Sequence, residues 1–168
     1  MKKIIIIFCF TALLVGCKKS EDRQECCNIE KAYANNEKKV TITNGIWGTV
    51  ANMEGNCMPM VGPGSTCKTC TVQRKIQVYP YTLKGNATLT AGEFVFYDSF
   101  NSTLIQEVNA DAEGFYEISL PAGTYSVAIV ENGKLYANST DGNGGLNPVT
   151  VSNGRIKFNV TMTYKAVF

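Results

Sequence analysis

The chain has 168 residues, with 16 Lys and Arg against 14 Asp and Glu, and it contains no histidine. This near-balance gives no basic stripe, so the long-range attraction on which nucleic-acid binding depends is missing. The absence of histidine excludes the Ser–His–Asp and Cys–His catalytic arrangements and removes the commonest metal ligand. We therefore expect no nucleic-acid partner, no metal site and no cofactor.

The first residues have the pattern of an export signal. Two lysines precede an apolar run over residues 4–15, which is shorter than the roughly 20 residues of a spanning helix. The following segment, Leu14-Val15-Gly16-Cys17, resembles the lipobox of bacterial lipoproteins. The resemblance implies that residues 1–16 are removed and that Cys17 carries acyl chains such as palmitate. More than one chain would make membrane anchoring stable.

Residues 17–39 are polar and charge-rich, and we interpret them as a lipidated tether in which a helical turn or two can form. The stretch Lys18-Lys19-Ser20-Glu21-Asp22 resembles the signal that sends lipoproteins to the outer face in Bacteroidetes, but it also suits an ordinary solvated linker. We expect a location at the outer membrane, facing either the periplasm or the surface. Residues 40–168 are expected to form one domain, since a chain of this length can build a real core.

Of the seven cysteines, Cys9 would leave with the signal and Cys17 would be lipidated, which leaves five in the mature protein. These are Cys26, Cys27, Cys57, Cys67 and Cys70. The last three lie in a Gly- and Pro-rich loop over residues 56–71, and an exported location permits disulfides.

Three interpretations of these cysteines stay open. One is a pair of structural disulfides, with one bond inside the loop and one from Cys26 or Cys27 to it. We favour Cys57 joined to Cys67 or Cys70, because a Cys67–Cys70 bond would close a small, strained ring. The second is a thiolate zinc site that uses Cys67-x-x-Cys70 with Cys57 and a tether cysteine. The third is redox chemistry at Cys67-x-x-Cys70, although such motifs usually precede a helix rather than a strand.

From residue 40 onward, short apolar segments alternate with Gly, Asn and Asp. The expected strand segments are residues 40–43 with 46–50, 72–81, 94–97, 104–108, 115–120, 125–130, 135–136, 149–151 and 156–164. The segment 94–97 suits a strand that is buried on both faces, while residues 156–164 alternate strictly and predict one half-buried strand. Asn132-Gly133 and Asn153-Gly154 are hairpin signals. The pattern predicts an all-β, antiparallel β-sandwich of about seven to nine strands.

Three motifs carry a family resemblance. Residues 45–50 resemble the opening Ile-x-Gly-x-Val strand of carboxypeptidase regulatory-like domains. Residues 111–116 resemble their Asp-x-x-Gly-x-Phe/Tyr turn, and residues 120–127 resemble their Leu-Pro-x-Gly-x-Tyr hairpin. The resemblance covers about residues 45–164 and implies a transthyretin-like sandwich. The cysteine loop and the extra strand at 94–97 depart from that family. Independently, Pro121 fixes φ at the strand end, and Gly123 is expected to supply a positive φ.

Other candidate sites have ordinary structural explanations beside the functional ones. Asp111 and Glu113 are paired acids that suit either an enzyme or a turn. The segment 141–145 begins like a calcium loop but lacks the later acidic ligands, which favours a plain turn. Four tyrosines would form an aromatic platform for carbohydrate if they were exposed together. These are Tyr79, Tyr81, Tyr97 and Tyr136.

The sequence predicts a non-enzymatic, lipid-anchored envelope module that binds a glycan or an envelope protein, or that scaffolds an envelope complex. With no histidine and its acids placed in turns, the chain offers no catalytic residue that we would name. The alternative is a metal-binding or thiol-redox envelope protein that uses Cys57, Cys67 and Cys70. The ligand-binding residues are not identified at this level.

Overall fold

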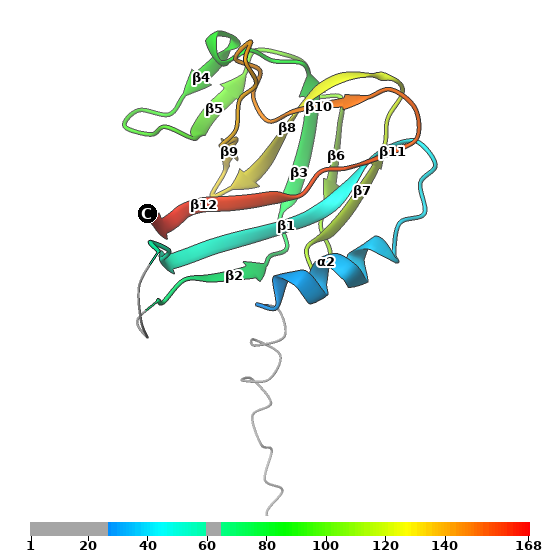
Figure 1. Cartoon of the computed structure of the whole chain (residues 1–168). Helices are drawn as coiled ribbons and strands as arrows, with labels where there is room; N and C mark the ends of the chain where they lie inside the picture. The colour runs from blue at the N-terminus through cyan, green and yellow to red at the C-terminus, as the bar shows by residue number, and fades with distance from the viewer. Residues whose placement is uncertain (1–26, 60–64) are drawn as a thin grey trace, which may run out of the picture.

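The structure is a computed structural model that describes residues 27–59 and 65–168. Within them the chain forms one α-helix, one turn of 3-10 helix and twelve strands in two facing sheets (Figure 1). The predicted all-β sandwich is confirmed, although the described residues contain more strands than the sequence indicated. The export signal, Cys17 and Cys26 lie outside the described residues.

Strand β1 (Gly45–Asn56) is the centre of the first sheet. Its first half pairs antiparallel with β7 (Phe115–Ser119) and parallel with β11 (Arg155–Lys157). Its second half pairs antiparallel with β2 (Lys68–Thr71) and parallel with β12 (Val160–Val167). The two parallel pairs correct the wholly antiparallel sandwich expected from sequence. Parallel neighbours need a crossover, and here the chain crosses into the second sheet before it returns as β11 and β12.

The second sheet is antiparallel and has the order β4-β5-β9-β8-β3-β6, with β10 beside the first half of β8. Its strands are β3 (Lys75–Pro80), β4 (Ala87–Leu89), β5 (Phe96–Phe100), β6 (Gln106–Asn109), β8 (Gly123–Glu131), β9 (Lys134–Tyr136) and β10 (Pro148–Val151). The 3-10 turn η1 (Lys84–Asn86) leads into β4. The β4–β5 pair extends beyond the edge of the sandwich in Figure 1.

The main core lies between the two sheets. Successive side chains of a strand point to opposite faces, so alternate residues of each strand face the partner sheet. Ile46 and Val50 of β1 meet Val127 and Ile129 of β8 in this cluster, and all four are fully buried. Burial of each such side chain contributes about 1.5–3 kcal/mol to the free energy of unfolding.

The second sheet also carries a smaller apolar cluster on its outer face. The cluster consists of Tyr79, Tyr97, Phe100, Ala128, Leu135, Ala137 and Leu146. On β8, Ala128 lies in this cluster while its neighbours Val127 and Ile129 lie in the main core, as the alternation of side chains requires. The outer face of this sheet is therefore partly apolar.

The predicted strand over residues 156–164 is broken into β11 and β12 at Phe158 and Asn159. There, Asn159 turns its side chain toward β1, and its Oδ1 accepts a hydrogen bond of 2.9 Å from the backbone N–H of Thr49. At Thr49, the side-chain amide of Asn159 thus takes the place of the backbone carbonyl that a continuous strand would supply. The alternate apolar residues from Ile156 to Tyr164 still pack on the main core, so the predicted inward face is confirmed.

Two of the predicted reversals connect the sheets instead of forming hairpins. The segment 120–125 joins β7 of the first sheet to β8 of the second, and Asn153-Gly154 joins β10 to β11 in the opposite direction. The Asn132-Gly133 hairpin between β8 and β9 is confirmed, with φ values of 52° and 77° at its two residues. Positive φ at both positions is the requirement of the type I′ turn.

Gly123 does not adopt the positive φ that the sequence predicted. Instead, a Cβ at this position would lie 3.0 Å from the hydroxyl oxygen of Tyr125. That hydroxyl donates a hydrogen bond of 2.9 Å to the carbonyl of Pro121, and the ring is buried. The tyrosine thus folds back over Gly123, and a larger residue there would require its ring to shift by a few tenths of an ångström.

Some segments differ from their predicted exposure or structure. Phe94 is 85% exposed and precedes β5, so residues 94–97 are not a strand buried on both faces. Residues 40–43 approach β1 without joining a sheet. The predicted tether contains a helix, α2 (Ile29–Glu37), which packs along β1 and β2 (Figure 1).

Candidate functional site

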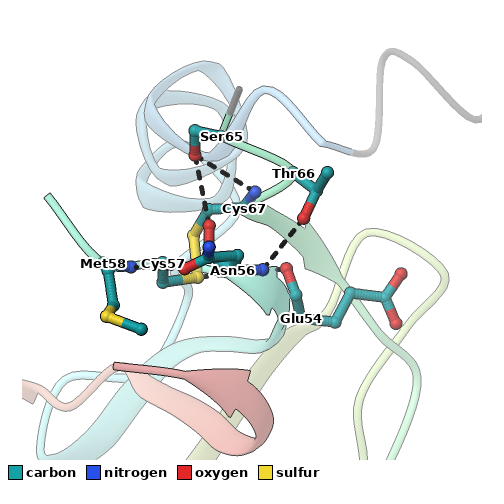
Figure 2. Close-up of a disulfide and its surroundings, with 7 residues drawn as sticks. All are labelled: Glu54, Asn56, Cys57, Met58, Ser65, Thr66 and Cys67. Carbon is teal, nitrogen blue, oxygen red and sulfur yellow. Dashed lines mark hydrogen bonds between the residues drawn. A yellow bond between two sulfur atoms is a disulfide. The ribbon is translucent and has the colours of Figure 1, made fainter. Parts of the chain in front are cut away.

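The cysteine loop is held by a disulfide between Cys57 and Cys67. Figure 2 shows the hydrogen bonds that join the two ends of the loop beside it. The backbone N–H of Asn56 donates to Thr66 Oγ1 over 2.9 Å, and Ser65 Oγ donates to the Asn56 carbonyl over 3.3 Å. The loop is shorter than the predicted 56–71, because β1 runs to Asn56 and β2 begins at Lys68. This disulfide therefore closes the end of a β1–β2 hairpin.

A second disulfide joins Cys27 to Cys70 of β2. It fixes the start of α2 to the first sheet, as the interpretation with two disulfides expected. Farther along the helix, Asn36 is fully buried, and its Nδ2 donates to Thr49 Oγ1 over 2.9 Å and to the Glu113 carbonyl over 3.0 Å. The helix is therefore part of the folded domain, which begins before residue 40.

The two bonds occupy the sulfur atoms of Cys27, Cys57, Cys67 and Cys70. A sulfur in a disulfide has no thiolate with which to bind zinc or attack a substrate. Among residues 27–59 and 65–168, no group of three or more His, Cys, Asp or Glu side chains lies close enough to hold a metal ion. In this structure the cysteines stabilise the hairpin and the helix.

The paired acids Asp111 and Glu113 stabilise a turn. Asp111 Oδ1 accepts hydrogen bonds of 2.9 Å from the N–H groups of Glu113 and Phe115. Lys39 Nζ lies 2.7 Å from Asp111 Oδ2 and 3.3 Å from Glu113 Oε2. Burial lowers the pKa of Lys39, but its bonds to the two carboxylates outweigh that effect and raise it above its usual value. These acids are therefore used in a turn and in ion pairs with Lys39.

The four tyrosines do not form an exposed platform. Tyr79 and Tyr97 are buried in the outer cluster, while Tyr136 is fully buried in the main core on the other face of the same sheet. Tyr81 donates its hydroxyl to both carboxylate oxygens of Asp141, at 2.8 and 3.0 Å. The alternative of a carbohydrate platform is therefore not met, because alternation places its members on opposite faces, and Tyr79, Tyr97 and Tyr136 are buried as the ordinary structural explanation expected.

The segment 141–145 is a turn closed by its own aspartate. Asp141 Oδ1 accepts hydrogen bonds from the N–H groups of Asn143 and Gly145, at 3.0 and 2.8 Å. Hydrogen bonds from the Gly145 N–H and the Tyr81 hydroxyl keep the pKa of Asp141 below its usual value. Its oxygens are thus committed to the turn and to Tyr81, as the interpretation of a plain turn expected.

A hollow of about 350 Å³ lies on the outer face of the second sheet, over β3, β5, β8 and β9. This volume is at the lower end of the range of small-molecule sites. Its lining consists of Gln77, Tyr79, Asp98, Ser99, Phe100, Ser102, Leu104, Val130, Gly133 and Leu135. The lining residues thus include polar and apolar ones, and we regard this hollow as the candidate functional site.

The base of the hollow is formed by the outer apolar cluster. The rings of Tyr79 and Phe100 are tilted with centroids 5.0 Å apart, and Tyr97 packs edge-on against Phe100 at 5.6 Å. Leu135 of β9 and the half-buried Val130 of β8 complete the base. These side chains pack against one another, and all but Val130 are buried, so the fold itself forms the base.

Two ion pairs border the hollow. Asp98 Oδ1 accepts a hydrogen bond of 2.8 Å from Thr90 and pairs with Lys134. These bonds lower the pKa of Asp98, with the Lys134 contact the larger cause. On the β3 side, Lys75 Nζ lies 2.8 Å from Glu107 Oε1 and lowers the pKa of that carboxyl. Each carboxylate near the hollow is thus ionised at neutral pH and matched by a lysine.

A chain of hydrogen bonds fixes the polar groups on the β3 side. The hydroxyl of Tyr79 donates to Gln77 Oε1 over 2.7 Å, and Gln77 Nε2 donates to Glu107 Oε2 over 2.9 Å. Burial, assisted by the charge of Glu107, raises the pKa of Tyr79, so its hydroxyl remains protonated. Gln77 therefore has its carbonyl occupied and retains a second amide hydrogen for a ligand.

Sequence reasoning missed this hollow. The sequence analysis named Tyr79 as a candidate, but Gln77, Asp98 and Ser99 belong to no motif. Gln77 lies about twenty residues before the other two in the chain. The sequence held only a weak, local indication of this hollow. Polar residues interrupt apolar ones on β3 and β5, which marks a face that is neither wholly core nor wholly wet.

None of the helices in the described part of the chain has the length and apolar character needed to cross a membrane. Comparison of the chain with protein-family models, with curated proteins and with solved structures found no match. The proposed function is therefore based on the fold, the hollow and the amino-acid sequence.

Proposed function

We propose that this protein is a non-enzymatic lipoprotein of the bacterial envelope, and that its sandwich binds a glycan or protein partner at the hollow on the second sheet. The observation that carries the proposal is the hollow itself, with its aromatic base and its polar and apolar lining residues. Concave sites with an apolar base and a few polar groups are the usual form of a ligand site.

The amino-terminal sequence supports the anchor. Leu14-Val15-Gly16-Cys17 suits lipidation at Cys17, and the neighbouring residues suit export to the outer membrane. Only nine residues lie between Cys17 and Cys27, where the second disulfide fixes the chain. At roughly 3.5 Å per residue this link spans at most about 35 Å. The anchored domain would work close to the bilayer, facing either the periplasm or the surface.

The chemistry of the described residues supports binding rather than catalysis. The acids that sequence marked as catalytic alternatives hold a turn, and the cysteines that could have bound metal or exchanged thiols form disulfides. The resemblance to carboxypeptidase regulatory-like domains fits a binding or structural module as well, and it remains a prediction.

The anchor is tested by the variant Cys17→Ser. We expect the variant to be found in the soluble fraction or to be retained with its signal uncleaved, since no acyl chain can be added to serine. The matched control Cys26→Ser should remain membrane-bound. A Cys17→Ser chain that is processed normally and still extracts with membranes would contradict the proposal.

The binding site is tested by Ser99→Trp, which introduces a large ring at an exposed residue of β5 that lines the hollow. Ser119→Trp is the matched control, because Ser119 is also exposed on a strand but lies on the first sheet. In pull-downs from envelope extracts, the wild type and Ser119→Trp should retain the same partner, and Ser99→Trp should lose it. Equal retention by all three would place the function elsewhere.

A further inference from the structure

We infer that the peptide bond between Asn147 and Pro148 is a site of slow self-cleavage, in which the side-chain amide of Asn147 is the nucleophile. The inference does not depend on the proposed binding function, because none of the residues that line the hollow takes part in it. It follows from the identity of the two residues, from the hydrogen bonds around Asn147 and from its backbone conformation.

Asn147-Pro148 is the only Asn-Pro pair in the chain, and the chemistry of such a pair is restricted. At most asparagines, the backbone nitrogen of the next residue attacks the side-chain amide, and the residue is deamidated. Proline cannot take this route, because its nitrogen carries no hydrogen and is part of a ring. The reaction that remains is the opposite attack, in which Nδ2 of Asn147 attacks the main-chain carbonyl carbon of the same residue and closes a five-membered succinimide ring.

The atoms of this reaction balance with water as the only further reagent. A bond forms between Nδ2 and the carbonyl carbon of Asn147, and the bond from that carbon to the nitrogen of Pro148 breaks. Nδ2 gives a proton to water, and the nitrogen of Pro148 takes one from water. Two fragments result, the first of which ends in a succinimide, and their masses add up to the mass of the intact chain.

The nucleophile is buried and has no competing partner. Asn147 is 1% exposed, and its Nδ2 has no hydrogen-bond acceptor among the described residues. By contrast, Nδ2 of the buried Asn36 donates two hydrogen bonds. Buried polar groups are normally hydrogen-bonded, so an exception calls for an explanation. An amide nitrogen without an acceptor can approach an electrophile without first breaking a hydrogen bond.

Hydrogen bonds polarise both carbonyl groups of Asn147. Its Oδ1 accepts a bond of 2.9 Å from the N–H of Ser139 and one of 2.8 Å from the hydroxyl of the same residue. Negative charge develops on Oδ1 as Nδ2 loses its proton, and these two donors stabilise that charge. The main-chain carbonyl of Asn147 accepts a bond of 3.2 Å from the N–H of Val127, which stabilises the oxyanion formed when Nδ2 attacks.

The backbone at the proposed cleavage point is held in a costly conformation. The φ of Asn147 is 38°, in the left-handed region that residues with a Cβ seldom adopt. Its N–H donates a bond of 2.8 Å to the carbonyl of Ser139, and the next residue already belongs to β10. Cleavage would release this constraint. Pro148 is only half-buried, so water can protonate the leaving nitrogen.

Cleavage would leave the sandwich assembled. The second fragment would contain β10, β11 and β12, of which β10 pairs with β8 and β12 pairs with β1. The fragment also contributes buried side chains to the main core, namely Val149, Val151, Val160 and Met162. The lipid anchor proposed at Cys17 would stay on the first fragment, so the second would be held only by strand pairing and packing.

The test is a long incubation of the purified full chain in mild detergent with protease inhibitors, followed by mass spectrometry of denatured samples. We expect one fragment that begins at Pro148 and a partner fragment that ends in a succinimide, which is lighter by one water than a hydrolysed end. The same chain kept in guanidinium chloride should be cleaved at least about tenfold more slowly, because the donors from Ser139 and Val127 are then lost.

Three variants separate the nucleophile from the group that positions it. Asn147→Gly removes the amide and tolerates the positive φ, so this chain should stay intact. Ser139 is a positioning residue, so Ser139→Ala should slow cleavage about tenfold through the lost hydrogen bond, and Ser139→Thr should restore the rate. Thr140→Ala, at an exposed neighbouring residue, is the matched control and should be cleaved as the wild type is. Thermal denaturation checks that each variant is folded.

Three results would overturn the inference. The first is a folded wild-type chain that stays intact throughout the incubation. The second is an equal rate of cleavage in the folded and the denatured chain, because the fold would then contribute nothing. The third is cleavage before Pro148 in Asn147→Gly, because the break would then be hydrolysis without the side-chain amide.

Discussion

Glu131 is the acidic residue that the fold buries most deeply among those described, with a side chain only 4% exposed. The guanidinium of Arg74 pairs with it, and the hydroxyl of Tyr164 donates a hydrogen bond of 2.6 Å. Burial raises the pKa of Glu131, but these hydrogen bonds outweigh it and hold the pKa below its usual value. In turn, burial and the bond to Glu131 raise the pKa of Tyr164 to about 12. The cluster ties β8 to β12 across the sandwich.

This cluster predicts an acid-dependent loss of stability. Because the pKa of Glu131 is lower in the folded state, its contribution is complete above the unfolded pKa, near 4.5, and is lost as the pH falls through the folded value. Glu131→Gln should lower the free energy of unfolding at pH 7 by about 2–3 kcal/mol, and the difference from wild type should shrink below about pH 4.5. Urea denaturation between pH 3 and 7 measures it. Glu93→Gln, at an exposed carboxylate, is the control, and a pH-independent difference at Glu131 would contradict the account.

Gly48 of β1 lies against the break between β11 and β12 at Phe158. A Cβ at this position would lie 2.1 Å from the carbonyl oxygen of Phe158, which is backbone and cannot rotate away. Gly48→Ala should therefore lower the free energy of unfolding by about 2–4 kcal/mol. Gly85→Ala is the matched control, since a Cβ there meets nothing within 4 Å, and its effect should stay within about 0.5 kcal/mol. Equal melting temperatures for the two variants would show that β1 and Phe158 are not so close.

At the scale of helices and strands, the sequence predicted those features that depend on a few neighbouring residues, such as the inward face of a strand or a tight turn. Alternation correctly identified the inward face of the last strand region, from Ile156 to Tyr164, and Asn132-Gly133 correctly identified a hairpin. Which strands become neighbours depends on contacts far apart in the chain, so the parallel pairing of β1 with β12 was missed. The sequence indicated a helical turn or two in the tether, whereas α2 is a helix of nine residues. Its buried face carries an asparagine among only a few apolar residues, so its hydrophobic pattern is weak.

That buried asparagine gives a test of whether α2 belongs to the domain. Asn36→Ala removes both hydrogen bonds of Nδ2 and leaves the Glu113 carbonyl without this donor, so we expect a loss of about 1–3 kcal/mol. Asn35→Ala, on the exposed face of the same helix, should change stability by less than about 0.5 kcal/mol. Thermal denaturation of both variants measures the difference. If they behaved alike, residues 29–37 would be a tether, as the sequence indicated.

The two disulfides should contribute unequally. In the chain-entropy account, a cross-link over 43 residues contributes about 4 kcal/mol and one over 10 residues about 3 kcal/mol. The double variant Cys27→Ser with Cys70→Ser should therefore lose more stability than Cys57→Ser with Cys67→Ser. Peptide mapping without reduction checks the pairing, and denaturation of both variants checks the order. A Cys57–Cys70 bond, or the reverse order of stability, would contradict the structure.

At the scale of the whole molecule, the hollow exists because the second sheet has apolar residues on both faces. One face closes the main core, and the other carries the outer cluster that forms the base of the site. The sequence indicated an all-β sandwich because composition and turn spacing suffice for fold class. It could not indicate the hollow, because β3, β5, β8 and β9 are brought together only by the order of strands in the sheet.

The proposed anchor and the hollow lie on different sides of the sandwich. A lipid anchor at Cys17 would reach the domain at Cys27, beside α2 and the first sheet, while the hollow lies on the outer face of the opposite sheet. In an anchored molecule the attachment and the proposed site are therefore on different sides of the sandwich, which leaves the site accessible to a ligand.

Photo-crosslinking in intact cells tests the central claim most directly. A photoreactive diazirine side chain is placed at Ser99 in the hollow or, in a second protein, at Ser119 on the other sheet, with the anchor left intact. The account predicts a covalent adduct with an envelope ligand from position 99 and none from position 119. Adducts from position 119 alone, or equal adducts from both, would contradict a binding site on the second sheet.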